Sequence, residues 1–156
     1  MTNTLATDIK FIVFQLANKE YAIPVHQVQG IEKVEHITRV PRTEKFVKGV
    51  INLRGVITPI IDLRSRFNIG EEEYSDSTRV IIVGFNNLEV GFIVDSANDV
   101  LDIPTGSIEP APEVVGVEGV DYINGVAKIG KRLLILIDLE KILNTEEKSN
   151  KQGIDG

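Results

Sequence analysis

Residues 11–31, FIVFQLANKEYAIPVHQVQGI, lie without a gap over residues 80–100, VIIVGFNNLEVGFIVDSANDV. In this alignment, apolar residues coincide at positions 11, 12, 13, 14, 16, 21, 23, 25, 28 and 31. Asn18 also coincides with Asn87, in the middle of the segment, where two strands would need a turn. Self-similarity at a fixed offset is the mark of an internal repeat. The stretch therefore indicates that one structural unit is built twice.

A second block of the chain repeats farther on. Residues 49–63, GVINLRGVITPIIDL, match residues 125–139, GVAKIGKRLLILIDL, and both copies begin with Gly-Val and end with Ile-Asp-Leu. The offset is 76 here (125 − 49) and 69 in the first block (80 − 11), so the later copy carries seven extra residues. We place this insertion in 104–124, which is rich in Pro and Gly and has the composition of an irregular surface loop.

Each copy has the residue pattern of short β-strands. With 6 Phe, 3 Tyr and no Trp, the core must be filled by Val, Ile and Leu, and β-branched residues favour strands. We expect strands at 11–16 and 21–25, and at 50–53 and 56–63, with a tight turn at Arg54 and Gly55. Pro59 indicates an edge position or a bulge, and short helical turns are expected at 64–68 and 140–144.

The pattern predicts an all-β fold made of two small barrel lobes. We expect one domain over 9–144, with the first lobe at about 9–68 and the second at about 78–144. A barrel of about 65 residues is marginally stable alone, so the lobes should share a buried seam. The polar ends, 1–8 and 145–156, are expected to be flexible tails.

Composition excludes several classes of protein. The chain of 156 residues has 42% apolar and 26% charged residues, which is typical of a folded protein, and it has no Cys for disulfides or thiolate metal sites. No secretory signal is visible, and the longest apolar run, 133–137, is far short of the roughly 20 residues of a membrane helix. The formal charge is −6, and no cluster of Lys and Arg with interleaved aromatics appears. We expect a soluble, cytoplasmic protein without nucleic-acid binding or membrane insertion.

Residues with catalytic potential lack the context that catalysis needs. Asp62 and Asp138 occupy equivalent positions, as paired acids would in an aspartic protease, but each stands between Ile and Leu. We expect each to cap the short helix that follows it. His26 and His36 do not have the spacing of metal ligands. The sequence therefore predicts a protein that is not an enzyme and that has no cofactor and no metal.

The segment GVINLRGVITPIIDLRSRF, residues 49–67, closely resembles the signature of the CheW family of chemotaxis coupling proteins. Weaker matches lie on both sides of this segment and occur in the right order, so that the resemblance covers about 9–144. It implies two pseudo-repeated, five-stranded, SH3-like β-barrel lobes with short helical turns, in agreement with the repeat. It also implies a free-standing adaptor, monomeric when free, that links methyl-accepting chemoreceptors to the histidine kinase CheA. Such an adaptor would be recruited to membrane-bound receptor arrays.

The repeat and the resemblance together nominate residues for receptor binding. Features found in one copy only are candidates for function, and Arg54 is one, because its counterpart is Gly130. In the family, the receptor's helical tip binds an apolar groove between the lobes. The positions that match are Val28, Gly49, Arg54, Ala97 and Val100. For Val28, Ala97 and Val100, plain core packing stays open, and Gly49 could instead shape the backbone.

Residues for kinase binding are expected in two loops. Val114 and Val115 place apolar side chains in a loop expected to be exposed, which in the family joins coupling proteins and kinase regulatory domains into rings. The counterpart in the first copy contains Ile37 and Val40. Two alternatives remain: the same scaffold in a receptor–kinase pathway that is not flagellar, and a β-barrel that binds a small ligand.

Overall fold

The chain folds into two β-sheets with short helices between them, described in a computed structural model for residues 7–70, 72–110 and 120–144. These described residues form two short α-helices, α1 (Leu63–Arg66) and α2 (Leu139–Leu143). No helix among the described residues is long and apolar enough to cross a membrane. The strands are β1 (Asp8–Leu16), β2 (Lys19–Pro24), β3 (Val28–Lys33), β4 (Val47–Leu53), β5 (Val56–Asp62), β6 (Arg79–Phe85), β7 (Leu88–Val94), β8 (Ser96–Pro104), β9 (Ile108–Glu109), β10 (Ile123–Ile129) and β11 (Arg132–Ile137).

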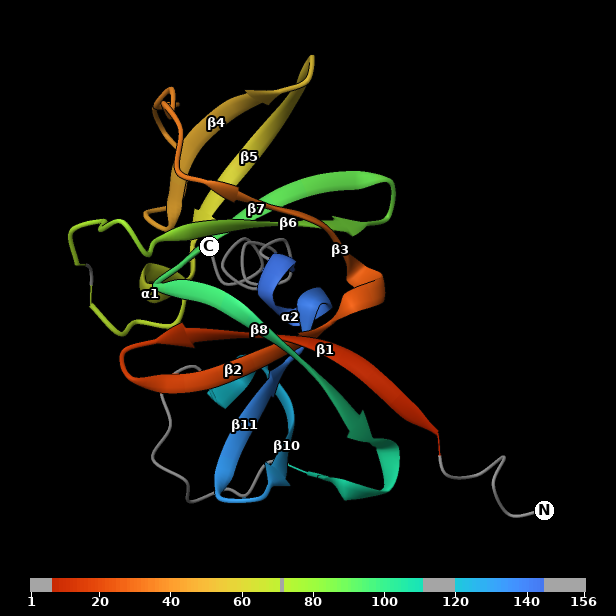
Figure 1. Cartoon of the computed structure of the whole chain (residues 1–156). Coiled ribbons are helices and arrows are strands. Elements are labelled where there is room, and N and C mark those ends of the chain that lie inside the picture. The colour runs from red at the N-terminus through yellow and green to blue at the C-terminus, as the bar shows by residue number, and fades with distance from the viewer. Residues whose placement is uncertain (1–6, 71, 111–119, 145–156) are drawn as a thin grey trace, which may run out of the picture.

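Each sheet takes strands from both halves of the chain. One sheet has the order β3-β6-β7-β5-β4 and the other the order β8-β1-β2-β11-β10-β9 (Figure 1). The expected lobe ranges, 9–68 and 78–144, therefore do not correspond to the two sheets. The hairpin β1–β2 belongs to the first half of the chain but pairs with β8 and β11 of the second half. The hairpin β6–β7 belongs to the second half but pairs with β3 and β5 of the first half. The two copies exchange their first hairpins.

The two sheets are equivalent strand by strand, as a duplication requires. β3, β6, β7, β5 and β4 stand where β8, β1, β2, β11 and β10 stand in the other sheet. The register shows the same equivalence: Val28 pairs with Val83, and its repeat partner Ala97 pairs with Phe14. The residues Phe14 and Val83 are themselves repeat partners. The duplication predicted from the sequence is therefore preserved in space.

Each sheet curls until its two edges meet. Beyond β3, Thr38 exchanges backbone hydrogen bonds of 2.9 and 2.8 Å with Val50 of β4. In the other sheet, β9 follows β8 after a single 3-10 turn at Thr105–Ser107 and pairs with β10. The six-stranded sheet is thus a five-stranded unit whose edge strand continues into β9, and both sheets have the barrel form that the sequence predicts.

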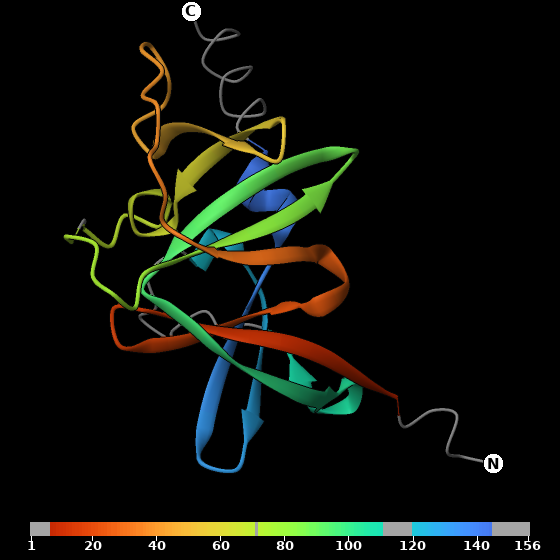
Figure 2. The same ribbon diagram turned by 45° about the horizontal axis from the view of Figure 1, so that its top comes forward.

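The core has three parts, which follow from the alternation of side chains along each strand. Phe11 and Val13 of β1 point into the barrel of the six-stranded sheet, whereas Ile12, Phe14 and Leu16 point toward the other sheet. The largest cluster, which we call the seam, combines buried residues of both sheets with Leu139 and Ile142 around α2. In Figures 1 and 2, α2 lies between the two sheets. The expectation of a shared seam is confirmed.

The turns and caps follow the expected local chemistry. The hairpin turns at 17–18, 54–55 and 86–87 have positive φ at both central residues, as type I′ turns require. Asp62 accepts a hydrogen bond from the backbone N of Arg64, and Asp138 from that of Lys141, so both aspartates cap helices. Pro59 lies in the part of β5 that pairs only with β4, because pairing with β7 begins at residue 60.

Candidate partner-binding surfaces

Three of the five predicted receptor-binding residues lie at the edge of the seam. Residues opposite each other in an antiparallel pair point to the same face of the sheet. Val28 lies opposite Val83, Ala97 opposite Phe14, and Val100 opposite Ile12, and all three partners belong to the seam. Val28 and Ala97 are half-buried against the seam, whereas Val100 is 51% exposed. These side chains therefore reach the surface where the seam ends.

A fourth residue of this surface was missed by the sequence analysis. Ile31 lies opposite Ile81 of the seam and is 39% exposed. Its repeat partner is Val100, so the offset of 69 that defines the repeat would have identified it. We call the surface formed by Val28, Ile31, Ala97 and Val100 the seam margin; it draws equally on the edge strands β3 and β8.

Behind the seam margin, the seam is packed with the chain's own side chains. Tyr21, Phe14 and Phe92 are fully buried there, and Phe14 stacks on Tyr21 with ring centroids 5.8 Å apart. Leu139 and Ile142 from α2 also pack into the seam. Beside α2, a cleft of about 720 Å³ is lined by Phe46, Ile61 and Val90 of the seam together with residues of α2. At the seam margin a partner helix would contact exposed side chains over a packed core, and the apolar groove expected between the lobes stays a prediction.

Arg54 occupies the tip of the β4–β5 hairpin and lies beside β3. Its Nη1 is 3.7 Å from Oε2 of Glu32, the residue that follows Ile31, and its side chain is 73% exposed. Its φ of 52° falls in the left-handed region, where Asn, Asp or Gly is preferred. The backbone N of Gly55 donates a 2.8 Å hydrogen bond to Oδ1 of the Asn52 side chain, so the turn holds without the guanidinium. The turn does not explain why an Arg is present.

Gly49 is buried, and the geometry supports the backbone role that the sequence left open. It has φ of +145°, and a Cβ placed on it would overlap the carbonyl of Thr38. Its repeat partner Gly125 is in the same situation against the carbonyl of Glu109. At both positions β4 or β10 carries a register irregularity where the edge of the barrel comes close.

The predicted kinase-binding residues of the first copy lie together. Ile37 is half-buried and Val40 is 39% exposed, and both line a cleft of about 600 Å³. We call this the basic cleft, because its rim carries Arg39, Arg42, Lys45 and Lys48. Val114 and Val115 lie outside the described residues.

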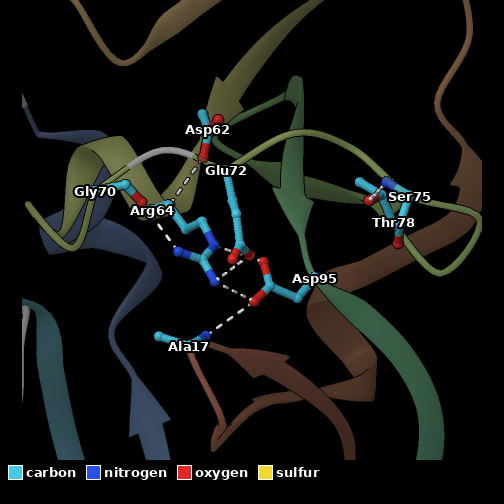
Figure 3. A network of polar contacts seen from close by, with 8 residues as sticks. All are labelled: Ala17, Asp62, Arg64, Gly70, Glu72, Ser75, Thr78 and Asp95. Carbon is cyan, nitrogen blue, oxygen red and sulfur yellow. Dashed lines mark hydrogen bonds and ion pairs between the residues drawn. The ribbon is translucent and has the colours of Figure 1, made fainter.

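A polar network fastens one sheet to the other near the middle of the molecule (Figure 3). Arg64, at the start of α1, donates two 2.8 Å hydrogen bonds to the carboxylate of Asp95, between β7 and β8. The same carboxylate accepts a 2.9 Å hydrogen bond from the backbone N of Ala17 in the β1–β2 turn. Hydrogen bonding to Asp95 raises the pKa of Arg64. Burial raises the pKa of Asp95, but the hydrogen bonds from Arg64 and Ala17 and the charge of Arg64 together hold it below its usual value.

A buried arginine joins the two short helices. The guanidinium carbon of Arg66 lies 4.4 Å from the ring centroid of Phe46 and 4.7 Å from that of Tyr122. Its Nε donates a 2.9 Å hydrogen bond to the carbonyl oxygen of Ile142 near the end of α2. Burial lowers the pKa of Arg66. Together with the Arg64–Asp95 network, this contact fixes how the two sheets face each other and hence the shape of the seam margin.

Comparison with known proteins agrees with this architecture. The family model described as CheW-like domain matches residues 10–147. The chain belongs to the CheW-like family. A chemotaxis protein CheW of Bacillus subtilis is 49% identical over 146 residues, which cover 94% of each chain. One of Klebsiella aerogenes is 44% identical over 138 residues, covering 88% of this chain and 83% of the relative. The crystal structure of the scaffolding protein TtCheW from Thermoanaerobacter tengcongensis matches with a TM-score of 0.83 and 37% identity, covering 89% and 94% of the two chains.

Membership of the CheW-like family confirms the predicted fold and the predicted class of function. The chain is a chemotaxis coupling adaptor, and nothing in these likenesses favours a small-ligand barrel or a pathway of another kind. The expected domain, 9–144, is close to the range that the family model matches. None of these likenesses assigns roles to individual residues, so the seam margin, Arg54 and the basic cleft rest on geometry.

Proposed function

We propose that this chain is a non-catalytic adaptor with two separate binding surfaces. The seam margin and Arg54 bind the helical cytoplasmic tip of a methyl-accepting chemoreceptor. Ile37 and Val40, with Val114 and Val115, bind the regulatory domain of the histidine kinase CheA. The free chain is a monomer in the cytoplasm and joins membrane-bound receptor arrays through these contacts.

The seam margin is the observation that carries the receptor part of the proposal. The residues that form the seam cluster are buried, whereas Ile31 and Val100, which lie opposite members of it, keep 39% and 51% of their surface exposed. Exposed apolar residues that are placed symmetrically about a rigid core suit the apolar face of a helix, which needs anchors at regular spacing. A receptor tip is a helical hairpin, so its two helices could meet β3 and β8 respectively.

Arg54 supplies the polar component of the same contact. Its ion pair with Glu32 places it next to β3. Because this pair is long and exposed, breaking it requires little free energy, and the guanidinium is available to a partner. A planar guanidinium forms forked hydrogen bonds with carboxylates or backbone carbonyls on a partner helix. Apolar anchors would then give affinity, and Arg54 would set the position of the helix along the margin.

Matched substitutions test the receptor surface. Val100→Glu places a charge on the seam margin, whereas Leu133→Glu places the same charge on another exposed apolar residue, 45% exposed, on β11. In a pull-down with a receptor cytoplasmic fragment, we expect Val100→Glu to weaken binding by about tenfold or more. Leu133→Glu should bind as the unmodified chain does. Equal binding by both variants would remove the seam margin from the mechanism.

The kinase surface has a separate test. Val40→Ser removes an exposed apolar contact and should weaken binding of purified CheA while leaving receptor binding unchanged. The reverse pattern, receptor binding lost and kinase binding kept, would show that the two surfaces have been assigned to the wrong partners.

A further inference from the structure

The basic cleft concentrates positive charge on a chain that is negative overall. Its rim has four cations, Arg39, Arg42, Lys45 and Lys48, and one carboxylate, Glu44, whereas the whole chain has a formal charge of −6. The four cations recur at every third residue: Arg39, Arg42 and Lys45 lie in the turn-rich segment between β3 and β4, and Lys48 lies at the start of β4. They were missed in the sequence because only one aromatic residue, Phe46, stands among them, whereas the other intervening residues are Val, Pro, Thr and Glu.

The cations of this rim are held out toward solvent. Arg39, Arg42 and Lys45 are exposed, and none of them forms an ion pair with another of the described residues. Arg64 and Arg132, by contrast, are each paired with two carboxylates. Arg39, Arg42 and Lys45 therefore present positive charge to which an acidic group of another molecule can bind.

The backbone holds this segment in a defined shape. Arg42 has φ of 64°, in the left-handed region that an arginine seldom adopts, which indicates a turn fixed by its surroundings. Thr43 donates a 3.1 Å hydrogen bond to the carbonyl oxygen of Val40 across this turn. At the other end, the Thr38–Val50 bridge fixes the segment to β4. The cations are thus displayed from a turn that is tied down at both sides of the cleft.

We propose that the basic cleft is a docking site for an acidic segment of polypeptide on the kinase. This inference rests on the proposed kinase contact at Ile37 and Val40 and names the chemistry of what binds there. The apolar side chains of Ile37, Val40 and Val47 line the cleft, and the cations form its rim. A peptide that carries an apolar residue among Asp and Glu matches both features.

A nucleic acid fits the cleft less well, although it is also an anion. No aromatic side chain lines the cleft on which a base could stack. A charge of −6 on the whole chain opposes the approach of a long polyanion. The volume of about 600 Å³ suits a few residues of peptide rather than the track of a nucleic-acid backbone.

Charge reversal and salt dependence test the proposal. In binding measurements with purified CheA, we compare the unmodified chain with the double variant Arg39→Glu/Lys45→Glu, which leaves the positive φ at Arg42 untouched. The control, Lys19→Glu/Lys131→Glu, makes the same change of charge on two exposed residues of the six-stranded sheet, one at the start of β2 and one in the β10–β11 turn. Binding of the unmodified chain should weaken about fivefold or more between about 50 and about 500 mM NaCl. The Arg39/Lys45 variant should bind about tenfold more weakly at low salt and lose most of the salt dependence, and the control should match the unmodified chain.

The outcomes separate this inference from the proposed function beneath it. If Val40→Ser weakens kinase binding but charge reversal and salt do not, the acidic partner is refuted and the kinase contact stands. If neither Val40→Ser nor charge reversal affects kinase binding, the kinase contact itself is wrong, and the inference falls with it. Binding of a DNA duplex at low salt that depends on Arg39 and Lys45, with kinase binding unchanged, would overturn the proposal in favour of a nucleic acid.

Discussion

Replacing Arg54 with Asn separates the contribution of this side chain to the fold from its contribution to binding. A non-glycine residue in the left-handed region costs about 1 kcal/mol relative to one that prefers it, and Arg54 has φ of 52°. The substitution also removes the ion pair with Glu32, which spans 3.7 Å and involves a guanidinium that is 73% exposed. Such pairs contribute about 0.5 kcal/mol or less. Arg54→Asn should therefore raise the free energy of unfolding by about 0.5 kcal/mol.

The same substitution should weaken receptor binding, because Asn lacks the forked donors of a guanidinium. Unfolding in urea, followed by circular dichroism, gives the change in stability, and a pull-down with a receptor cytoplasmic fragment gives the change in binding. Arg54→Ala is the control, since Ala has no preference for the left-handed region and should lower stability. If Arg54→Asn lowers stability by more than about 1 kcal/mol, or binds receptor normally, our interpretation of this turn is refuted.

Three further substitutions test the packing that shapes the binding surfaces. Asp95→Asn should lower the free energy of unfolding by about 2 kcal/mol at neutral pH. The pKa of Asp95 is lowered on folding. Its contribution to stability is therefore present above the unfolded pKa of about 3.9 and is lost as the pH falls through the folded pKa. Urea unfolding should therefore show the two chains converging below about pH 4, and a constant difference down to pH values of about 2 would contradict this. Gly49→Ala should lower the free energy of unfolding by more than about 3 kcal/mol in thermal unfolding, because the new Cβ would overlap Thr38. Gly55→Ala, with no atom within 4 Å of the new Cβ, should lower it by about 1 kcal/mol. Equal losses of stability in the two variants would refute the close approach of Gly49 to Thr38. Arg66→Met keeps the apolar contact with the rings of Phe46 and Tyr122, so it should lower the free energy of unfolding by at least about 2 kcal/mol less than Arg66→Ala does. Equal losses of stability in urea unfolding would show that this packing contributes little.

The repeat made the strands, turns and caps predictable, because these depend on residues close together in the chain. Continuous runs of apolar residues define β1 and β6, and Asp62 and Asp138 cap the helices that follow them. The exchange of hairpins between the copies could not be predicted. A hairpin has the same internal pairing whether it joins its own copy or the other one, and sequence similarity between the copies makes both choices look alike.

The binding surfaces were predictable only in part, for a related reason. Val28, Ala97 and Val100 were found by resemblance, and the repeat offset contained Ile31 as well. The Arg64–Asp95 hydrogen bonds join residues that are 31 positions apart, and no local pattern indicates such a contact. The exchanged hairpins bring large side chains such as Phe14 and Tyr21 into the seam, and the groove expected between the lobes stays a prediction.

Hydrogen–deuterium exchange of the full chain, with and without a receptor cytoplasmic fragment, tests the seam margin most directly. The account predicts slower exchange at backbone amides of 28–31 on β3, 97–100 on β8 and the turn at Arg54, with the β10–β11 hairpin unchanged. Protection confined to β10 and β11, with β3 and β8 exchanging as in the free chain, would contradict it.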